Sequence, residues 1–263
     1  FKDYFEAFTT IPTQCIDLSE RNPDKFVSLA RQTALKAGGT HWRVAGAPDD
    51  VALVGIASRD APNRRVYVAC SVSTDPAMKC YAIQTGVVHQ TEAVAGHGIR
   101  EFLTRHLRGR GIRRVVVYRS SLSENMYRYQ RQYEAAEIEA ACRDACGPDC
   151  AVFIVPTSDF YFRRLTGTAP ARCGTLLQTP FISPRLNGFV LCPRLSTFRG
   201  IQCVVTAAPP AFDMHWLATL TFQACHLFQF SAQTTSHPAP LMHCVRILQK
   251  TLKNANAKAM TCH

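Results

Sequence analysis

The first helical pattern in the chain spans residues 24–36. Apolar residues there recur at intervals of three and four, which predicts an amphipathic helix whose buried face is Phe26, Leu29, Ala30, Thr33 and Ala34. Gly38 and Gly39 are expected to end it. Three apolar segments of strand length follow, and their closeness along the chain predicts a meander: 51–57, 65–72 and 80–88.

The middle of the chain alternates helical patterns with short apolar runs. We expect helices over 93–107 and 125–145, and the runs 113–119 and 151–155 are typical of buried parallel strands. Further strands are predicted near 175–178, 188–192 and 201–206, and helices near 215–230 and 239–254. The order of three strands, helix, strand, helix, strand predicts a mixed α/β sheet with an antiparallel meander on one side. It fits the ribonuclease H topology, but it also fits several others, so it does not settle function.

Composition narrows the class of protein. The chain has 263 residues, of which 47% are hydrophobic, enough to bury the core of one large domain or two small ones. No apolar run approaches the roughly 18 residues of a membrane span. The first residues carry charges where a signal peptide would be apolar, and no initiator Met is present, so we expect the chain to be part of a longer protein.

Charge and cysteine usage point to an intracellular, basic protein. Thirty Lys and Arg against nineteen Asp and Glu give a net charge of +11, which favours a polyanionic partner, nucleic acid before membrane, over a merely soluble basic protein. The twelve cysteines are scattered through apolar segments, as buried reduced thiols are, which favours a reducing compartment: cytoplasm or nucleus, with an organelle left open. Cys142, Cys146 and Cys150 lack the paired C-x2-C spacing of structural zinc, so no metal or other cofactor is expected.

An ordered set of short motifs carries a family resemblance. The motifs are Ile11-Pro12-Thr13-Gln14-Cys15, Lys36-Ala37-Gly38-Gly39, Val54-Gly55-Ile56, Val117-Tyr118-Arg119, Phe153-Ile154-Val155, Cys173-Gly174-Thr175, Cys225-His226-Leu227-Phe228 and Pro238-Ala239-Pro240. Together they resemble the junction of the MID and PIWI domains of Argonaute and Piwi proteins, as far as about Lys253. Cys225-His226-Leu227 and the spacing of Gln32 from Lys36 lean towards the Piwi clade.

The resemblance implies an architecture. Residues 1–50 would be the C-terminal part of a MID-like domain, residues 51–258 a ribonuclease H-like PIWI domain, and residues 259–263 a tail. Because the resemblance begins inside the MID domain, we expect an N-terminal segment or a bound partner to cover residues 1–50.

The resemblance also implies a pocket for the 5′ phosphate of a guide RNA. It places Lys2, Gln14, Gln32, Lys36 and Lys250 at the pocket positions. Charge and several converging donors suit a phosphate. The alternative is that these five are ordinary polar surface residues.

At the nuclease positions of the family, this sequence departs from the pattern. The metal-ligand positions hold Ala57, Thr91, Ser120 and Val245, where cleaving relatives use carboxylates and a histidine or further Asp to hold two Mg²⁺ ions. Rescue by Asp60, Glu92, Glu124 or His243 is conceivable, but Asp60 and Glu124 are displaced by several residues. We therefore expect no ribonuclease activity.

Three hypotheses of function follow. The first is a non-cleaving, Piwi-like RNA-binding protein that holds a 5′-phosphorylated guide, or another RNA, for recognition of a second RNA, as in gene silencing. The second is a scaffold subunit of a large ribonucleoprotein that uses a degenerate PIWI domain without a small guide. The third is a nuclease with a displaced metal site. The expected partners are RNA and other protein subunits, and no membrane.

Overall fold

A mixed sheet forms the centre of the protein. The computed structural model describes residues 27, 29–30, 33–34, 48–61, 65–89, 98–120, 133–161, 171–178, 187–194, 199–228 and 234–261. The described strands are β1 (Val51–Ala61), β2 (Arg65–Ser73), β3 (Tyr81–His89), β4 (Arg114–Ser120), β5 (Ala151–Tyr161), β6 (Leu176–Gln178), β7 (Asn187–Leu191) and β8 (Arg199–Val205). The described helices are α3 (Ile99–Leu107), α5 (Ala135–Cys146), α7 (Met214–Ala224) and α8 (Ala239–Thr261).

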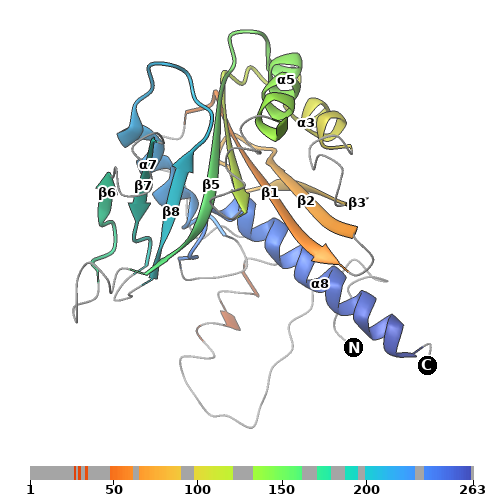
Figure 1. Cartoon of the computed structure of the whole chain (residues 1–263). Helices are drawn as coiled ribbons and strands as arrows, with labels where there is room; N and C mark the ends of the chain where they lie inside the picture. Colours follow the sequence, from red (N-terminus) through yellow and green to blue (C-terminus); the bar gives the residue numbers. More distant parts are fainter. Residues whose placement is uncertain are drawn as a thin grey trace.

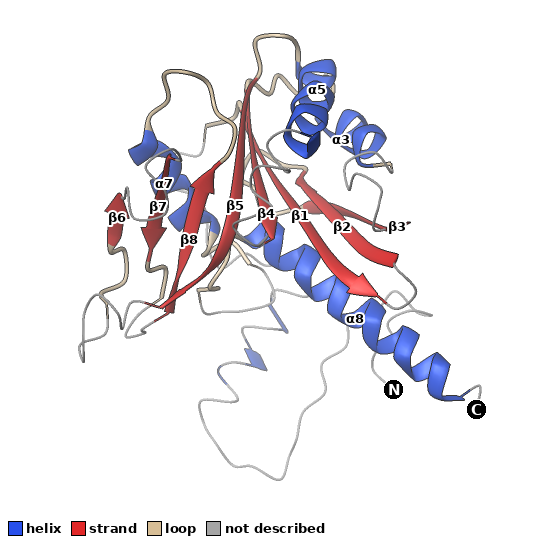
Figure 2. Cartoon of the chain, in the orientation of Figure 1, coloured by secondary structure: helices blue, strands red, loops and turns tan. Residues whose placement is uncertain are grey.

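The described strands form one eight-stranded sheet in the order β3-β2-β1-β4-β5-β8-β7-β6. The meander β1-β2-β3 is antiparallel, and β1, β4 and β5 run parallel through the middle. Helices α3 and α5 lie on one side of the sheet, and α7 and α8 lie on the other (Figures 1 and 2). The predicted mixed sheet with its meander is confirmed.

The two faces of the sheet bury separate cores. In β1, Val51, Leu53 and Ala57 belong to the core under α7 and α8, whereas Ala52, Val54 and Ile56 belong to the core under α3 and α5. Successive side chains of a strand point to opposite faces, so a strand covered on both sides reads as a continuous apolar run. This explains why the central strands were visible in the sequence.

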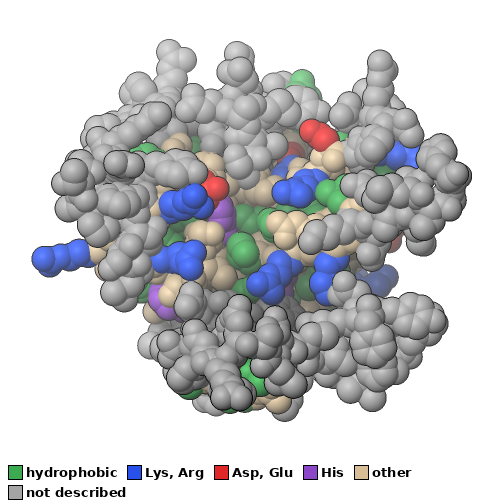
Figure 3. Space-filling model, turned by 90° about the horizontal axis from the view of Figure 1, so that it is seen from below, with side chains coloured by type: hydrophobic (Ala, Val, Ile, Leu, Met, Phe, Trp, Pro, Cys, Tyr) green, Lys and Arg blue, Asp and Glu red, His purple; other side chains and the backbone are tan. Residues whose placement is uncertain are grey.

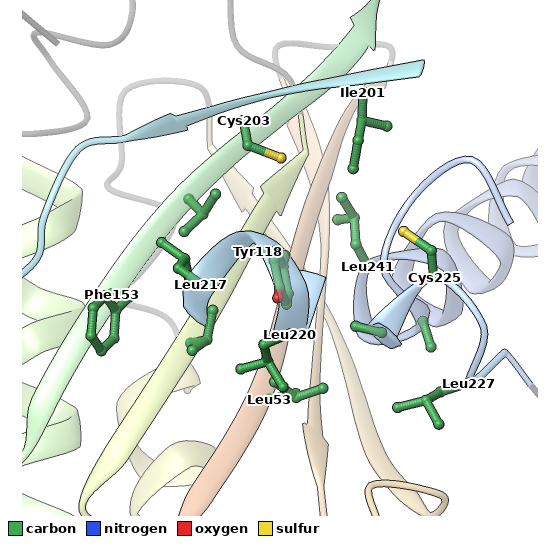
Figure 4. Close-up of a cluster of buried hydrophobic side chains, with 14 of the residues drawn as sticks. Leu53, Tyr118, Phe153, Ile201, Cys203, Leu217, Leu220, Cys225, Leu227 and Leu241 are labelled. Carbon is green, nitrogen blue, oxygen red and sulfur yellow. The ribbon is translucent and has the colours of Figure 1, made fainter. Parts of the chain in front are cut away.

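The core under α7 and α8 joins strands from across the sheet to both helices. Figure 4 shows Leu53 of β1, Tyr118 of β4 and Phe153 of β5 in the same cluster as Leu217 and Leu220 of α7. The Tyr118 hydroxyl lies 3.1 Å from Thr221 Oγ1, which satisfies the one polar atom that the ring buries there.

Several predicted boundaries were wrong. Helix α7 ends at Ala224 and not near residue 230, because the Cys225 carbonyl accepts hydrogen bonds from both the backbone N–H and the hydroxyl of Thr235. Strand β5 continues to Tyr161, because its polar second half pairs with β8. Helix α8 continues to Thr261 through a segment rich in Ala and Lys, which favour helix without an apolar stripe.

The helix predicted over 24–36 is described only in part. Val27, Leu29, Ala30, Thr33 and Ala34 are helical. Its predicted buried face is wrong for Ala30, Thr33 and Ala34, which are exposed. These short side chains bring little apolar area, so burying them would contribute little free energy. Among the described helices, none is both long and apolar enough to cross a membrane.

Candidate functional site

The carboxyl ends of the three central parallel strands meet at one edge of the sheet. Ile56 of β1 is in register with Arg119 of β4, and Ser120 of β4 is in register with Thr157 of β5. Ala57 follows Ile56 directly, so Ala57, Ser120 and Thr157 lie side by side at the strand ends, meaning the level at which the parallel pairing of these strands stops. Beyond this level, β1 continues to Ala61 and β5 to Tyr161. In open α/β sheets, ligands bind outside the carboxyl ends of the strands.

Helix α8 packs on one face of the sheet, against β1 and next to the strand ends. Its start lies so near β1 that a Cβ atom on Gly55 would stand 2.3 Å from the carbonyl carbon of Pro240. The Ser71 hydroxyl donates to the Pro240 carbonyl at 2.8 Å, and the Cys244 thiol donates to the Gly55 carbonyl at 3.2 Å. The glycine therefore sets how closely α8 approaches the strand ends.

Together these elements enclose a pocket of about 310 Å³. It is lined by Ala57, Ser58, Arg59, Ser120, Thr157, Ser158, Asp159, His237, Leu241, Met242, Val245 and Leu248. The last four come from one side of α8 and, with Ala57, form an apolar floor. Ala57, Ser120 and Val245, which the family resemblance placed at three metal-ligand positions, thus line one pocket. The prediction that these positions no longer bind metal stays a prediction.

A buried ion pair supports the polar wall of the pocket. Arg119 Nε donates to Glu134 Oε1 at 2.8 Å, and both residues are buried, at 1% and 5% exposure. The two terminal guanidinium nitrogens donate to Ser120 Oγ at 2.8 Å and to Ser58 Oγ at 2.9 Å. Glu134 balances the charge of Arg119, so the guanidinium acts here as a rigid hydrogen-bond donor.

Asp159 and His237 stand together at the pocket wall. His237 Nε2 lies 4.0 Å from Asp159 Oδ1, and the Asp159 side chain is 59% exposed. Burial lowers the pKa of His237, and the nearby Asp159 carboxylate opposes that shift. No family motif marks Asp159, so it was not among the predicted site residues. The only sequence signal is its position after an apolar strand, directly after the polar residues Thr157 and Ser158.

The described residues that line this pocket offer few ligand atoms of the kind that Mg²⁺ prefers. The side chains of Ala57 and Val245 carry no ligand atom, and Asp159 is the one carboxylate among the lining residues that the structure describes. Mg²⁺ requires oxygen ligands in near-octahedral geometry, and carboxylates supply the charge that retains it. Within the described ranges, no three His, Cys, Asp or Glu side chains are grouped to hold a metal, Cys142, Cys146 and Cys150 included.

The described rescue candidates lie elsewhere. Asp60 is exposed on β1 and does not line the pocket. His243 is buried between the rings of Tyr81 and Phe228, at centroid distances of 4.7 and 4.9 Å, and burial lowers its pKa to about 4. It stands two residues before Val245 on α8, which turns it towards the opposite side of the helix. Thr91, Glu92 and Glu124 lie outside the described residues.

Four of the five predicted phosphate-binding residues also lie outside the described part of the chain: Lys2, Gln14, Gln32 and Lys36. The fifth, Lys250, is exposed on α8 and does not line the pocket. The guide-phosphate pocket and the domain boundaries at residues 50 and 258 stay predictions.

Basic side chains surround the strand ends. Figure 3 looks at the molecule from this end, and Lys and Arg side chains gather there around a hollow in which hydrophobic side chains are visible. The elements that meet at this end carry exposed basic residues: Arg59, Arg65, Arg199, Arg246 and Lys250. A basic rim of this kind suits the phosphates of a nucleic acid.

Comparisons with known proteins agree on the architecture. The model of the Piwi domain family matches residues 1–255. No curated protein sequence matches the chain. The structure is similar to that of Drosophila Piwi, with a TM-score of 0.70 and 17% identity over 87% of this chain and 33% of the other.

Two Argonaute structures are also similar. One is Kluyveromyces polysporus Argonaute with a guide RNA, with a TM-score of 0.62 and 11% identity over 81% of this chain and 30% of the other. The other is Clostridium butyricum Argonaute bound to a guide DNA and a target DNA, with a TM-score of 0.59 and 14% identity over 89% of this chain and 32% of the other. The chain thus spans about a third of each protein, and at these identities the likeness concerns the ribonuclease H-like fold.

Proposed function

The chain belongs to the Piwi domain family, and from this premise we propose that it holds a 5′-phosphorylated guide RNA and presents it to a second RNA without cutting that RNA. The fold is that of proteins whose structures contain a guide RNA, or a guide DNA with its target. The net charge of +11 favours a polyanionic partner of the same kind.

The proposal that the protein does not cut RNA rests on the residues that line the pocket at the strand ends. Ala57, Ser120 and Val245 bring a methyl group, a hydroxyl group and an isopropyl group to the place where the strand ends converge. Two-metal hydrolysis needs ligands that hold both ions against the attacking and leaving oxygens. Among the described lining residues the one carboxylate is Asp159, which is exposed and offers too little negative charge for that task.

Sequencing the RNA that co-purifies with the native protein tests whether the protein holds a guide RNA. We expect short RNAs with uniform 5′ ends. Long RNA together with a stable set of protein subunits would instead support a scaffold subunit of a ribonucleoprotein. The family's fold is compatible with both, so the length and the 5′ ends of the RNA decide between them.

Lys36→Ala is expected to weaken binding of a 5′-phosphorylated RNA by about 1.5–3 kcal/mol, the range for a hydrogen bond to a charged group. The loss should be much smaller for the same RNA with a 5′ hydroxyl, because the contact is to the terminal phosphate. Lys79→Ala, in the β2–β3 turn, is the matched control, since it removes one charge elsewhere. Equal losses for the two RNAs would show that Lys36 contributes only general electrostatic attraction.

A further inference from the structure

The pocket at the strand ends has unused hydrogen-bonding capacity. Ser120 Oγ accepts from Arg119 at 2.8 Å and from the Ser58 N–H at 3.3 Å, which occupies both of its lone pairs. Ser58 Oγ accepts from Arg119 at 2.9 Å. Within the described residues, neither hydroxyl donates to a protein acceptor. Each serine therefore has a proton to give to a ligand, and the guanidinium behind it strengthens that donor.

The rest of the lining sets the shape and polarity of a ligand. The floor is apolar and made by Ala57, Leu241, Met242, Val245 and Leu248, while the Asp159 carboxylate supplies an acceptor at the wall. The volume of about 310 Å³ lies at the lower end of the ~300–1,000 Å³ typical of small-molecule pockets. The pocket thus suits a small ring with apolar surfaces and an edge that both accepts and donates hydrogen bonds.

Other ligand classes fit less well. A divalent cation would find one carboxylate among the described lining residues. A phosphate could pair with Arg59, but it would stand beside the Asp159 carboxylate and would leave the apolar floor uncovered. An aliphatic side chain of a peptide would cover the floor but would leave both serine hydroxyls without an acceptor. A nucleobase satisfies the floor, the donors and the acceptor together.

We propose that this pocket binds an unpaired nucleobase, supplied by a free nucleoside or by an RNA bound across the basic rim. The claim that the base belongs to a bound RNA rests on the proposed function, whereas the claim that the pocket binds a nucleobase does not. Unpaired bases are the form in which proteins read RNA edges, because stacking and pairing hide them in a duplex.

The first arm of the test uses the four nucleosides as probes. Adenosine, guanosine, cytidine and uridine are titrated separately into the full chain by calorimetry. We expect at least one to bind, and Val245→Phe, which fills the floor, to weaken that binding by about tenfold or more. Gln249→Phe is the matched control, because it places the same ring on an exposed position of α8 outside the pocket. Absence of binding for all four, or equal binding by the two variants, overturns the proposal.

A second variant guards against misfolding of Val245→Phe. Asp159→Asn changes an exposed side chain, so it should unfold at the temperature of the wild type. It is expected to weaken the same nucleoside, because a charged acceptor becomes a neutral amide. Unchanged affinity of Asp159→Asn would contradict the role of Asp159 as the acceptor. If, in addition, folded Val245→Phe binds the nucleoside as tightly as the wild type, the proposal is wrong.

The second arm identifies the source of the base. Two RNA duplexes are compared, one fully paired and one with a single unpaired 2-aminopurine. Tighter binding of the second by the wild type, lost in Val245→Phe, assigns the pocket to a base of bound RNA. Equal binding of both duplexes, with nucleoside binding retained, assigns it to a free nucleoside. If the wild type binds no RNA, the proposed function fails, while the nucleoside arm still decides the pocket.

Discussion

Arg119→Leu is expected to lower the free energy of unfolding by about 3–5 kcal/mol, the cost of breaking a buried ion pair by removing one partner. The guanidinium is buried and makes hydrogen bonds to Glu134, Ser58 and Ser120. Its removal leaves the Glu134 carboxylate buried without its partner and takes the support from both serine hydroxyls. Chemical denaturation of the wild type and the variant measures the difference.

A surface pair offers the matched control for that substitution. Arg100 of α3 pairs with Asp144 of α5, but both side chains are about half exposed or more, at 62% and 49%. Arg100→Leu should therefore cost only about 0–1 kcal/mol. In Arg119→Leu/Glu134→Leu, where no unpaired charge remains, part of the stability should return. Similar losses for Arg119→Leu and Arg100→Leu would contradict the burial of the Arg119–Glu134 pair.

Gly55→Ala is expected to destabilise the fold by about 3 kcal/mol or more, because overpacking of this kind meets backbone and cannot be relieved by a side-chain rotation. The added Cβ would stand 2.3 Å from the Pro240 carbonyl carbon and 2.6 Å from the Leu241 nitrogen. Helix α8 would have to move away from β1, which would also open the pocket. The change in unfolding free energy and the yield of folded protein both report this.

Gly86→Ala tests whether the loss of stability in Gly55→Ala comes from the contact with α8 or would follow from replacing any glycine in a strand. Gly86 lies in β3 at the edge of the sheet, and a Cβ there would meet no atom within 4 Å. Its substitution should change stability by no more than about 0.5 kcal/mol. A loss as large as that of Gly55→Ala would show that close approach of α8 is not the cause.

The sequence predicted the centre of the fold well for a physical reason. Strands β1, β4 and β5 are covered on both faces, so 51–57, 113–119 and 151–155 read as apolar runs. The polar second half of β5 had no such pattern, because its pairing with β8 is a long-range contact that local residues do not encode. The end of α7 was missed for the same reason: Thr235, which holds the Cys225 carbonyl, lies ten residues further along the chain.

Three residues of the candidate site could be selected from the sequence, but the pocket that they line could not be predicted from it. The family resemblance selected Ala57, Ser120 and Val245, and strand register together with the approach of α8 brings these three to one hollow. Asp159 was missed because no motif marks it. The network of Arg119 with Glu134 could not be foreseen either, since it depends on a buried contact between β4 and the residue just before α5.

A single reaction tests the central claim of RNA-guided binding without cleavage. The full chain is incubated with a 5′-phosphorylated guide RNA, a labelled complementary target RNA and Mg²⁺ or Mn²⁺, and the target is followed on filters and on denaturing gels. We predict retention of the target that depends on the guide, with the target intact. Cleavage opposite the centre of the guide, abolished by Asp60→Asn or Glu92→Gln, would contradict the loss of the nuclease, and retention that ignores the guide sequence would contradict guided binding.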